Sequence, residues 1–339
     1  MRVAMYYNNR DVRVEEMPKP EIGPHELLVK VKASGICGSD VMEWYRLKRA
    51  PLVLGHEIAG DIVETGEGVT QYKIGQRVFV AHHVPCNNCR YCRNGNQTVC
   101  ETLHTTNYFP GGFSEYIRVP KVNAEQGVLV LPQEVSYEEA TLIEPLACVI
   151  RAQRIAQLKP AQSVIILGAG LSGLLHLLLA HSLGAKPVMV TDVNDYRLKA
   201  ANEFGADAVI DARQDVVSAL RKSNQGRLAD LVIVCTGSQS AFEQSLQCVD
   251  RAGTILFFAP TAPGVKLGIP VNDFWRISVK LMHSYGSSPQ DAKEALDLIQ
   301  KKTVNLKKII THQLGLKQAA LGFKLVSEAK ECLKVVIKP

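Results

Sequence analysis

The sequence predicts an α/β protein in which a β-rich region precedes a doubly wound parallel sheet. Short β-type runs punctuated by Gly and Pro fill roughly the first 145 residues. From about residue 150, near-continuous apolar strands alternate with helices, which is typical of a parallel sheet covered on both faces. The glycine-rich turn Gly168-Ala-Gly-Leu-Ser-Gly173 directly follows the first of these strands.

The local pattern predicts each element in order. The β-rich region is expected to contain strands at Glu26–Ala33, Ile58–Glu64, Arg77–Ala81 and Phe113–Val119. The parallel sheet is expected to use Ser163–Leu167, Pro187–Thr191, Ala208–Asp211, Leu231–Cys235 and Thr254–Phe258. A helix is expected over Leu171–Leu183, stopped by Gly184, and another ends at Phe204 before Gly205. The last region predicts a helix near Asp291–Lys301 and a strand over Leu333–Ile337.

Length, composition and charge limit the classes of function that are expected. A length of 339 residues favours two domains, and 46% hydrophobic with 21% charged residues is ordinary for a globular protein. The net charge of +6 is spread along the chain, so neither a nucleic-acid nor a membrane-surface partner is expected. The N-terminus lacks the apolar core of a signal peptide. Nine cysteines without an export signal indicate a reducing compartment, the cytoplasm, and metal ligation.

Four cysteines form the densest ligand cluster of the chain: Cys86, Cys89, Cys92 and Cys100. Four thiolates this close predict one tetrahedral Zn²⁺ with no open position, and therefore a structural site. An iron–sulfur cluster is the first alternative, but its related cysteine run closes after three residues, where this one closes after seven. A nucleic-acid-binding zinc ribbon is the second, and its two cysteine pairs stand farther apart.

The glycine-rich turn predicts a Rossmann dinucleotide site, because a strand precedes it and a helix follows. Gly168 allows the tight turn, Gly170 admits a pyrophosphate and Gly173 permits close helix–strand packing. Asp192 ends the next strand, where its carboxylate favours NAD over NADP. Arg197 complicates this preference, since a guanidinium is able to face a phosphate. The expected cofactor contacts are Gly168, Gly170, Leu171, Ser172, Gly173, Asp192, Arg197 and Thr236.

Three remote segments offer a second metal site. Gly35-Ile-Cys-Gly-Ser-Asp40 supplies Cys37, Gly55-His-Glu57 supplies His56 and Glu57, and Ile143-Glu-Pro145 supplies Glu144. A thiolate, an imidazole and a carboxylate form the donor set of a catalytic zinc with one open position. Neighbours on a regular strand face opposite sides, so His56 and Glu57 bind one ion only if the backbone is irregular there. The choice between Glu57 and Glu144 stays open.

The combination of these motifs with Gly111-Gly-Phe-Ser-Glu-Tyr116 resembles the zinc-dependent medium-chain alcohol dehydrogenases over nearly the whole chain, and within them the sorbitol or polyol group. The tract from Val304 to His312 is similar to that group's C-terminal part. The resemblance implies a GroES-like catalytic domain over residues 1–147 with a zinc lobe at about 84–104. It also implies a Rossmann domain over 148–285, a returning segment over 286–339 and an active site in the cleft between the domains.

By this resemblance, Cys37 and His56 are zinc ligands, Glu57 and Glu144 ligate zinc or its water, and Ser39 contacts the substrate alcohol. One departure is Met42, which stands where many relatives carry a proton-relay histidine and which holds no proton. His82, His83 and His104 are the alternative relay candidates. A second departure is Ser284 next to Tyr285, where some polyol enzymes carry an arginine.

The implied function is NAD-dependent hydride transfer to and from a small polar secondary alcohol: a polyol, sugar alcohol or diol. The alternatives are a zinc dehydrogenase for L-threonine, a cyclitol or a sugar phosphate, and a non-catalytic nucleotide-binding protein. By analogy, a homodimer or homotetramer is expected. Trp44, Tyr45, Tyr108 and Phe109 are candidates for the pocket lining.

Overall fold

The computed structural model describes residues 1–304, 306 and 308–339. Two compact units divide the chain: one contains residues 1–147 and 287–339, and the other contains residues 148–286. Within the described residues, every helix falls short of the length and apolarity that a membrane span requires.

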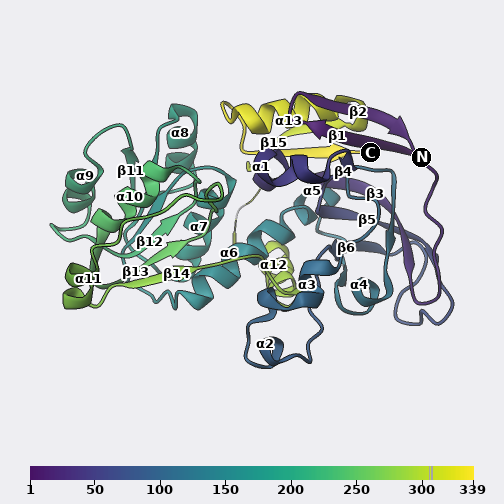
Figure 1. The fold of residues 1–339 in the computed structure, drawn as a ribbon, viewed down its shortest axis with the longest axis horizontal. Helices are drawn as coiled ribbons and strands as arrows, with labels where there is room; N and C mark the ends of the chain where they lie inside the picture. Colours follow the sequence, from purple (N-terminus) through teal and green to yellow (C-terminus); the bar gives the residue numbers. More distant parts are fainter. Residues whose placement is uncertain (305, 307) are drawn as a thin grey trace. The chain divides into compact units, whose positions relative to one another are not determined.

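The first unit is built on a large, mostly antiparallel sheet with the strand order β15-β16-β3-β5-β6-β8, to which β7 adds by pairing with β3 (Figure 1). Buried aliphatic side chains on these strands form its core. The strands are β3 (Leu27–Gly35), β5 (Glu57–Thr65), β6 (Arg77–Ala81), β7 (Tyr116–Val119), β8 (Val128–Val130), β15 (Ile310–Gly315) and β16 (Lys334–Lys338).

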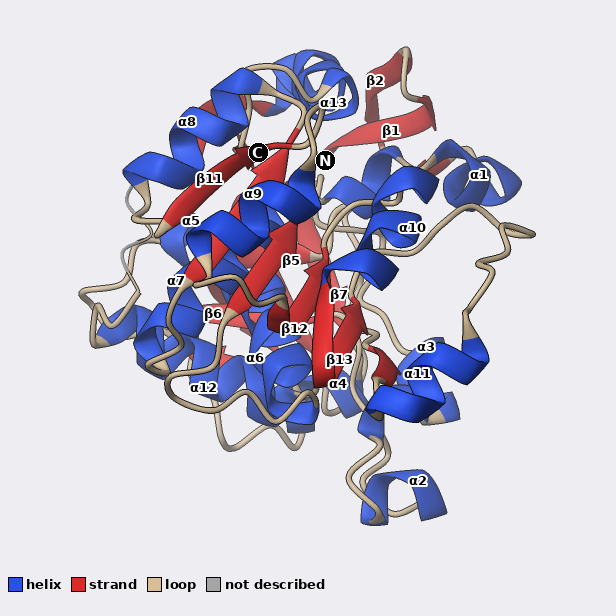
Figure 2. Ribbon diagram, turned by 90° about the vertical axis from the view of Figure 1, so that its left-hand side faces the viewer, coloured by secondary structure: helices blue, strands red, loops and turns tan. Residues whose placement is uncertain are grey.

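A small sheet of order β2-β1-β4 completes the strands of this unit. It consists of β1 (Arg2–Asn8), β2 (Asp11–Glu16) and β4 (Leu52–Val53). The helices are short; Figure 2 shows them in blue around the red strands. They are α1 (Glu43–Arg46), α2 (Arg90–Arg93), α3 (Glu101–Thr105), α4 (Lys121–Gln126), α5 (Tyr137–Ala140), α12 (Pro289–Gln300) and α13 (Ala319–Glu328), with 3₁₀ turns η1 (Gly38–Val41), η2 (Leu47–Arg49), η3 (Gln97–Val99) and η4 (Leu316–Gln318).

The C-terminal strand matters most for the site. β16 pairs antiparallel with the end of β3, with Val336 opposite Gly35 and Ile337 opposite Ser34. The last residues of the chain therefore lie directly beside the segment that carries Cys37. This return explains why residues 287–339 belong to the first unit.

The second unit is a six-stranded parallel sheet of order β11-β10-β9-β12-β13-β14. Its strands are β9 (Val164–Leu167), β10 (Val188–Asp192), β11 (Ala208–Asp211), β12 (Ala229–Val234), β13 (Val249–Phe257) and β14 (Lys280–His283). The helices are α7 (Leu171–Ser182), α8 (Asp195–Glu203), α9 (Val216–Ser223), α10 (Gln239–Cys248) and α11 (Val271–Ile277), while α6 (Ile143–Ile155) begins in the first unit. This strand order is that of the Rossmann fold, with the switch point between β9 and β12, so the predicted fold class is confirmed.

The predicted elements are largely present, with shifts of a few residues at their ends. The expected strand Phe113–Val119 is shorter, because only Tyr116–Val119 pairs with β3. The hairpin of β1 and β2 was not expected, since its mixed polar sequence hides the alternation of a strand. Residues 305 and 307 of the C-terminal tract lie outside the described residues.

Candidate active site

Cys37 is presented by a tight capping turn at the end of β3. It caps η1: the backbone N–H of Ser39 donates to the Cys37 Sγ at 3.5 Å, and the Cys37 N–H donates to Asp40 Oδ2 at 3.0 Å. This reciprocal pair is a capping box, in which residues three apart satisfy the free N–H groups of a helix start. The Cys-Gly-Ser-Asp sequence thus fixes the position of the thiol locally.

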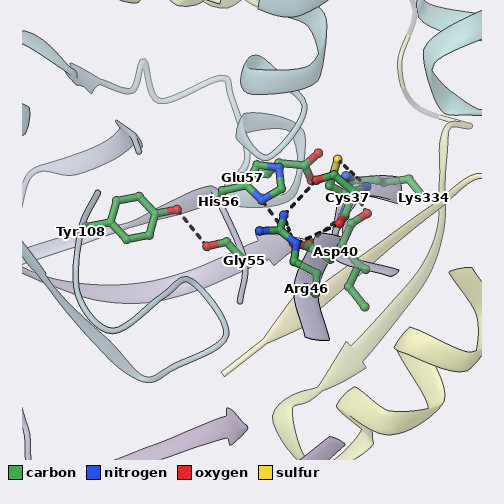
Figure 3. Close-up of polar contacts among 10 residues, drawn as sticks. Cys37, Asp40, Arg46, Gly55, His56, Glu57, Tyr108 and Lys334 are labelled. Carbon is green, nitrogen blue, oxygen red and sulfur yellow. Dashed lines mark hydrogen bonds and ion pairs between the residues drawn. The ribbon is translucent and has the colours of Figure 1, made fainter. Parts of the chain in front are cut away.

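His56 and Glu57 converge because the chain turns immediately before β5. Gly55 has a φ of +94°, which favours glycine, and regular strand pairing begins only at Glu57. The backbone is therefore irregular just before Glu57, as binding of one ion by both His56 and Glu57 requires. One donor atom each of Cys37, His56 and Glu57 lies within 4.8 Å of the other two (Figure 3).

Asp40 orients the imidazole. The His56 Nδ1 lies 3.4 Å from the Asp40 Oδ1, which leaves the Nε2 free for a metal. Burial opposes a charge on His56, but the carboxylate of Asp40 and the thiol of Cys37 outweigh it and raise the pKa of His56 well above its usual range. A carboxylate behind the imidazole is the usual support of a metal-bound histidine.

Glu57 forms a buried ion pair with Lys334 of β16 (Figure 3). Both side chains have no exposed surface, and the ammonium also donates to the carbonyl oxygen of Ile36 at 3.1 Å. Gly35 makes room for the pair, because a Cβ there would overlap the Glu57 carboxylate and the Lys334 stem. The other carboxylate oxygen, Oε1, is buried without a hydrogen-bond partner among the described residues.

The donor set fits a zinc ion. A sulfur, a nitrogen and an oxygen donor converge, as in catalytic zinc sites that keep a fourth position open. A bound cation would also satisfy the orphaned Oε1 of Glu57. Glu144, half-buried in the first turn of α6, does not join the group. Of the two candidate carboxylates, Glu57 is the one that lies within 4.8 Å of the other two donor atoms.

Replacing Lys334 with Met is expected to destabilise the first unit by about 3–5 kcal/mol when no ion is bound to Glu57, because it leaves that carboxylate buried and unpaired. Urea unfolding, followed by Trp44 fluorescence in a Trp275→Phe background, measures this. The double variant Lys334→Met/Glu57→Gln should recover most of the loss.

Lys338 offers the matched control, since its ammonium pairs with Glu138 at the surface, where the lysine side chain is 48% exposed. Lys338→Met is expected to cost at most about 1 kcal/mol, as for other surface ion pairs. Equal effects of the two lysine substitutions would contradict a special role for the buried pair.

The proposed substrate-contacting hydroxyl lies next to this centre. Ser39 is half-buried in η1, and its Oγ accepts a hydrogen bond from the Arg46 Nη2 at 3.1 Å. Met42 follows η1, so a proton relay through that position is absent. The sequence analysis missed Arg46 and Lys334 entirely and did not assign Asp40 a role, although its place in the Cys-Gly-Ser-Asp turn was a usable signal.

Two of the three candidate relay histidines lie beside the centre. The His82 ring centroid is 4.9 Å from that of His56 and 3.9 Å from that of His83. Burial, together with His83, lowers the pKa of His82 well below its usual range, and burial lowers the pKa of His83 to about 4. The third candidate, His104, is exposed in α3.

The four candidate pocket aromatics separate into two groups. Tyr108 is 2% exposed and belongs to the core, where its hydroxyl donates to the Gly55 carbonyl oxygen at 3.3 Å. It supports the Gly55 turn, and burial raises its pKa well above the usual range, reinforced by Asp40, Glu144 and Glu57. The other three, Trp44, Tyr45 and Phe109, are exposed.

The four-cysteine cluster is assembled for a single ion. All four sulfurs lie within 4.8 Å of one another, with 3.5 Å from Cys89 to Cys92 and 3.6 Å from Cys86 to Cys100. Four sulfurs about 2.3 Å from one tetrahedral zinc stand about 3.8 Å apart. An iron–sulfur cluster would hold its thiolates farther apart, because several metal atoms lie between them. The geometry fits one structural zinc with a closed shell.

The glycine-rich turn of the second unit has the features of a dinucleotide cradle. Gly168 follows β9 with a φ of +106°, and a Cβ on Gly173 would overlap the Gly168 carbonyl oxygen. Gly170 caps α7, whose first residues are Leu171 and Ser172. Thr236 follows β12 and lies against Gly168, so that a Cβ on Gly168 would stand 3.3 Å from the Thr236 Cβ. The turn thus sits at the switch point where open α/β sheets bind ligands.

Asp192 and Arg197 flank this turn. The Asp192 Oδ2 accepts the Ala169 N–H at 2.7 Å, and its Oδ1 accepts the Asn194 N–H at 2.9 Å. The Arg197 Nη1 lies 4.0 Å from Asp192, and the Nε is buried without a partner among the described residues. A Cβ on Gly170 would have this guanidinium as its nearest neighbour, at 3.7 Å. The uncrowded glycine and the unpaired Arg197 Nε fit a dinucleotide.

Comparison with known proteins finds two family matches along the chain. Residues 23–132 match the alcohol dehydrogenase GroES-like domain, and residues 173–301 match the zinc-binding dehydrogenase family. The chain is 31% identical to a sorbitol dehydrogenase of Bacillus subtilis, covering 100% of this chain and 97% of the relative. It is 32% identical to an L-threonine 3-dehydrogenase of a Chelativorans species, covering 96% and 94%.

Solved structures extend the likeness to the whole fold. A zinc-binding dehydrogenase from Sinorhizobium meliloti bound to NADP superposes with a TM-score of 0.89 at 27% identity, covering 100% of this chain and 99% of that one. An alcohol dehydrogenase of Escherichia coli complexed with NADH gives 0.88 at 27%, with the same coverage. On the matched families and the full-length relatives, the chain belongs to the zinc-containing medium-chain alcohol dehydrogenases.

Proposed function

We propose that this protein is an NAD-dependent dehydrogenase of a small polar secondary alcohol, best a polyol, sugar alcohol or diol. The observation that carries the proposal is the convergence of Cys37, His56 and Glu57 within 4.8 Å in a family of zinc dehydrogenases. Family membership supports the reaction class, while relatives named for sorbitol and for threonine leave the substrate to experiment.

The residues have separable roles. Cys37, His56 and Glu57 would hold the zinc, and Asp40 would keep the His56 Nε2 directed at it. A zinc ion bound there supplies Lewis-acid polarisation of an alcohol oxygen. The Ser39 Oγ accepts one hydrogen bond from Arg46 and has a second lone pair that would accept the alcohol proton while the Ser39 hydroxyl releases its own proton. Because Met42 carries no proton, the released proton would leave to water.

Asp192 supports NAD as the cofactor. Its carboxylate ends β10, at the position that binds the ribose hydroxyls of NAD and repels the 2′-phosphate of NADP. NAD is the hydride carrier in such a site. The Arg197 Nη1 is 4.0 Å from this carboxylate and reduces its repulsion of the NADP 2′-phosphate. The preference for NAD over NADP therefore has to be measured.

The test is a screen of the purified enzyme, with zinc content measured in parallel. We expect two zinc ions per chain, one for each cluster, and NADH formation with at least one polyol, diol, threonine, cyclitol or sugar phosphate. NAD should be used with a higher kcat/KM than NADP. One zinc per chain and no turnover on the panel would instead support a non-catalytic nucleotide-binding protein.

Oligomeric state is part of the same proposal. By analogy with its relatives, we propose a homodimer or homotetramer, which analytical ultracentrifugation of the purified enzyme decides.

A further inference from the structure

Arg46 holds the hydroxyl that we place on the substrate alcohol. Its side chain is 14% exposed, and it donates from Nη2 to the Ser39 Oγ at 3.1 Å and from Nε to the Ser39 carbonyl oxygen at 2.9 Å. A guanidinium carries a permanent charge and only donates hydrogen bonds. A neutral alcohol needs no such charge beside Ser39, so Arg46 calls for an explanation.

The carboxylates near Arg46 accept hydrogen bonds from only part of its guanidinium group. Among the residues that the structure describes, its one ion pair runs from Nη2 to the Asp40 Oδ1 at 3.3 Å, and Asp40 also contacts His56 and accepts the Cys37 N–H. Glu43, on the same helix, accepts the Asn9 N–H at 3.1 Å. In the part of the chain that the structure describes, the Nη1 group of Arg46 has no protein acceptor.

The buried lysine of the same site is already paired. Lys334 is committed to Glu57. Arg46 therefore presents a permanent positive charge, with its Nη1 group available, next to Ser39.

We propose that Arg46 selects a substrate that carries an anionic oxygen group, a carboxylate or a phosphate, within a few bonds of the reacting carbinol. The planar guanidinium is suited to such a group, because two of its N–H donors match two oxygens. This inference rests on the alcohol dehydrogenase activity proposed above and narrows its substrate class. Ser39 and Arg46 would then bind neighbouring parts of one molecule.

The kinetic test compares three substrates of one configuration on the zinc-loaded enzyme: a hexitol, its 1-phosphate and the corresponding hexonate. At least one anionic member is expected to have about a tenfold or higher kcat/KM than the hexitol. Arg46→Gln is expected to lower this ratio about tenfold or more, mainly through KM. Arg49→Gln removes a nearby exposed charge as the control and should leave the ratio unchanged. The phosphate and hexonate arms distinguish the two kinds of anion.

A binding test makes the inference independent of turnover. Inorganic phosphate and acetate are titrated into the Trp275→Phe enzyme while the fluorescence of Trp44, two residues from Arg46, is followed. Saturating NAD is present, because free phosphate otherwise binds the glycine-rich turn. Saturable binding of one anion that weakens at least severalfold in Arg46→Gln, and not in Arg49→Gln, is the expected result.

The outcomes separate the two proposals. Binding of an anion through Arg46 without turnover of any alcohol would overturn the dehydrogenase function and leave the anion site standing. Turnover with a preference for the neutral hexitol, or a ratio unchanged in Arg46→Gln, would overturn the anionic substrate. If Arg46→Gln does not fold, Arg46→Lys serves instead: it keeps the charge, loses the two-pronged geometry and should lower the ratio severalfold, and an unchanged ratio again overturns the proposal.

Discussion

Replacing His56 with Ala is expected to lower turnover on the order of a thousandfold and to remove one of the two zinc ions per chain. His56 is the nitrogen donor of the group that also contains the Cys37 thiol and the Glu57 carboxylate, and two remaining donors hold a zinc ion poorly. Removing the ion withdraws several kcal/mol of charge stabilisation from the reaction, and about 4 kcal/mol corresponds to a thousandfold.

The control is His104→Ala, because His104 is an exposed histidine of α3 outside both ligand groups. It should keep both zinc ions and wild-type kcat. Steady-state kinetics and metal analysis are measured on the same preparations, with circular dichroism to show that each variant is folded. Wild-type turnover of His56→Ala at full zinc content would remove this residue from the site.

Replacing Cys92 with Ala is expected to act on stability before it acts on the hydride step. Cys92 is 7% exposed and is one of four sulfurs that close the shell, so the variant should lose the second zinc. Structural zinc binding contributes folding free energy directly. A loss of about 3–5 kcal/mol would lower the unfolding temperature by on the order of 10 °C in a unit of this size.

Cys248→Ala provides the comparison, since Cys248 is also buried but lies in the core of the second unit, away from any metal cluster of the described residues. It should keep both zinc ions. Differential scanning calorimetry and metal analysis distinguish the two cysteine variants. The soluble Cys92→Ala enzyme should retain kcat per catalytic zinc. If it remained fully stable and lost only turnover, the four-cysteine site would have a role in chemistry that its closed shell does not suggest.

Short-range features were predictable because their geometry is encoded by neighbouring residues. The four cysteines of 86–100 lie within one lobe, and their spacing alone predicted the cluster that the structure assembles. The glycine-rich turn was equally predictable, since the positive φ of Gly168 and the crowding at Gly173 are local requirements for glycine. Asp192 was found because it ends a recognisable strand.

The open metal site was only partly predictable, because its ligands come from separate segments. The sequence named Cys37, His56, Glu57 and Glu144 but had no means to choose between the two carboxylates. The proximity of Glu57 to the other two donors depends on the turn at Gly55, which has a φ of +94° and precedes His56 and Glu57. The dihedral angles of a single turn are harder to predict from residue types than the periodicity of a strand.

The sequence by itself determined the α/β fold class, the closed cysteine cluster and the dinucleotide turn, because each depends on contacts between residues near in the chain. Only the tertiary structure decided which groups surround the open site. Pairing of β16 with β3 brings Lys334 onto Glu57 across 277 residues, and the packing of α1 on η1 brings Arg46 onto Ser39. The first contact arises from long-range strand pairing, and the second, between residues seven apart, from local packing of α1 on η1. Neither leaves a recognisable pattern of spacing in the sequence.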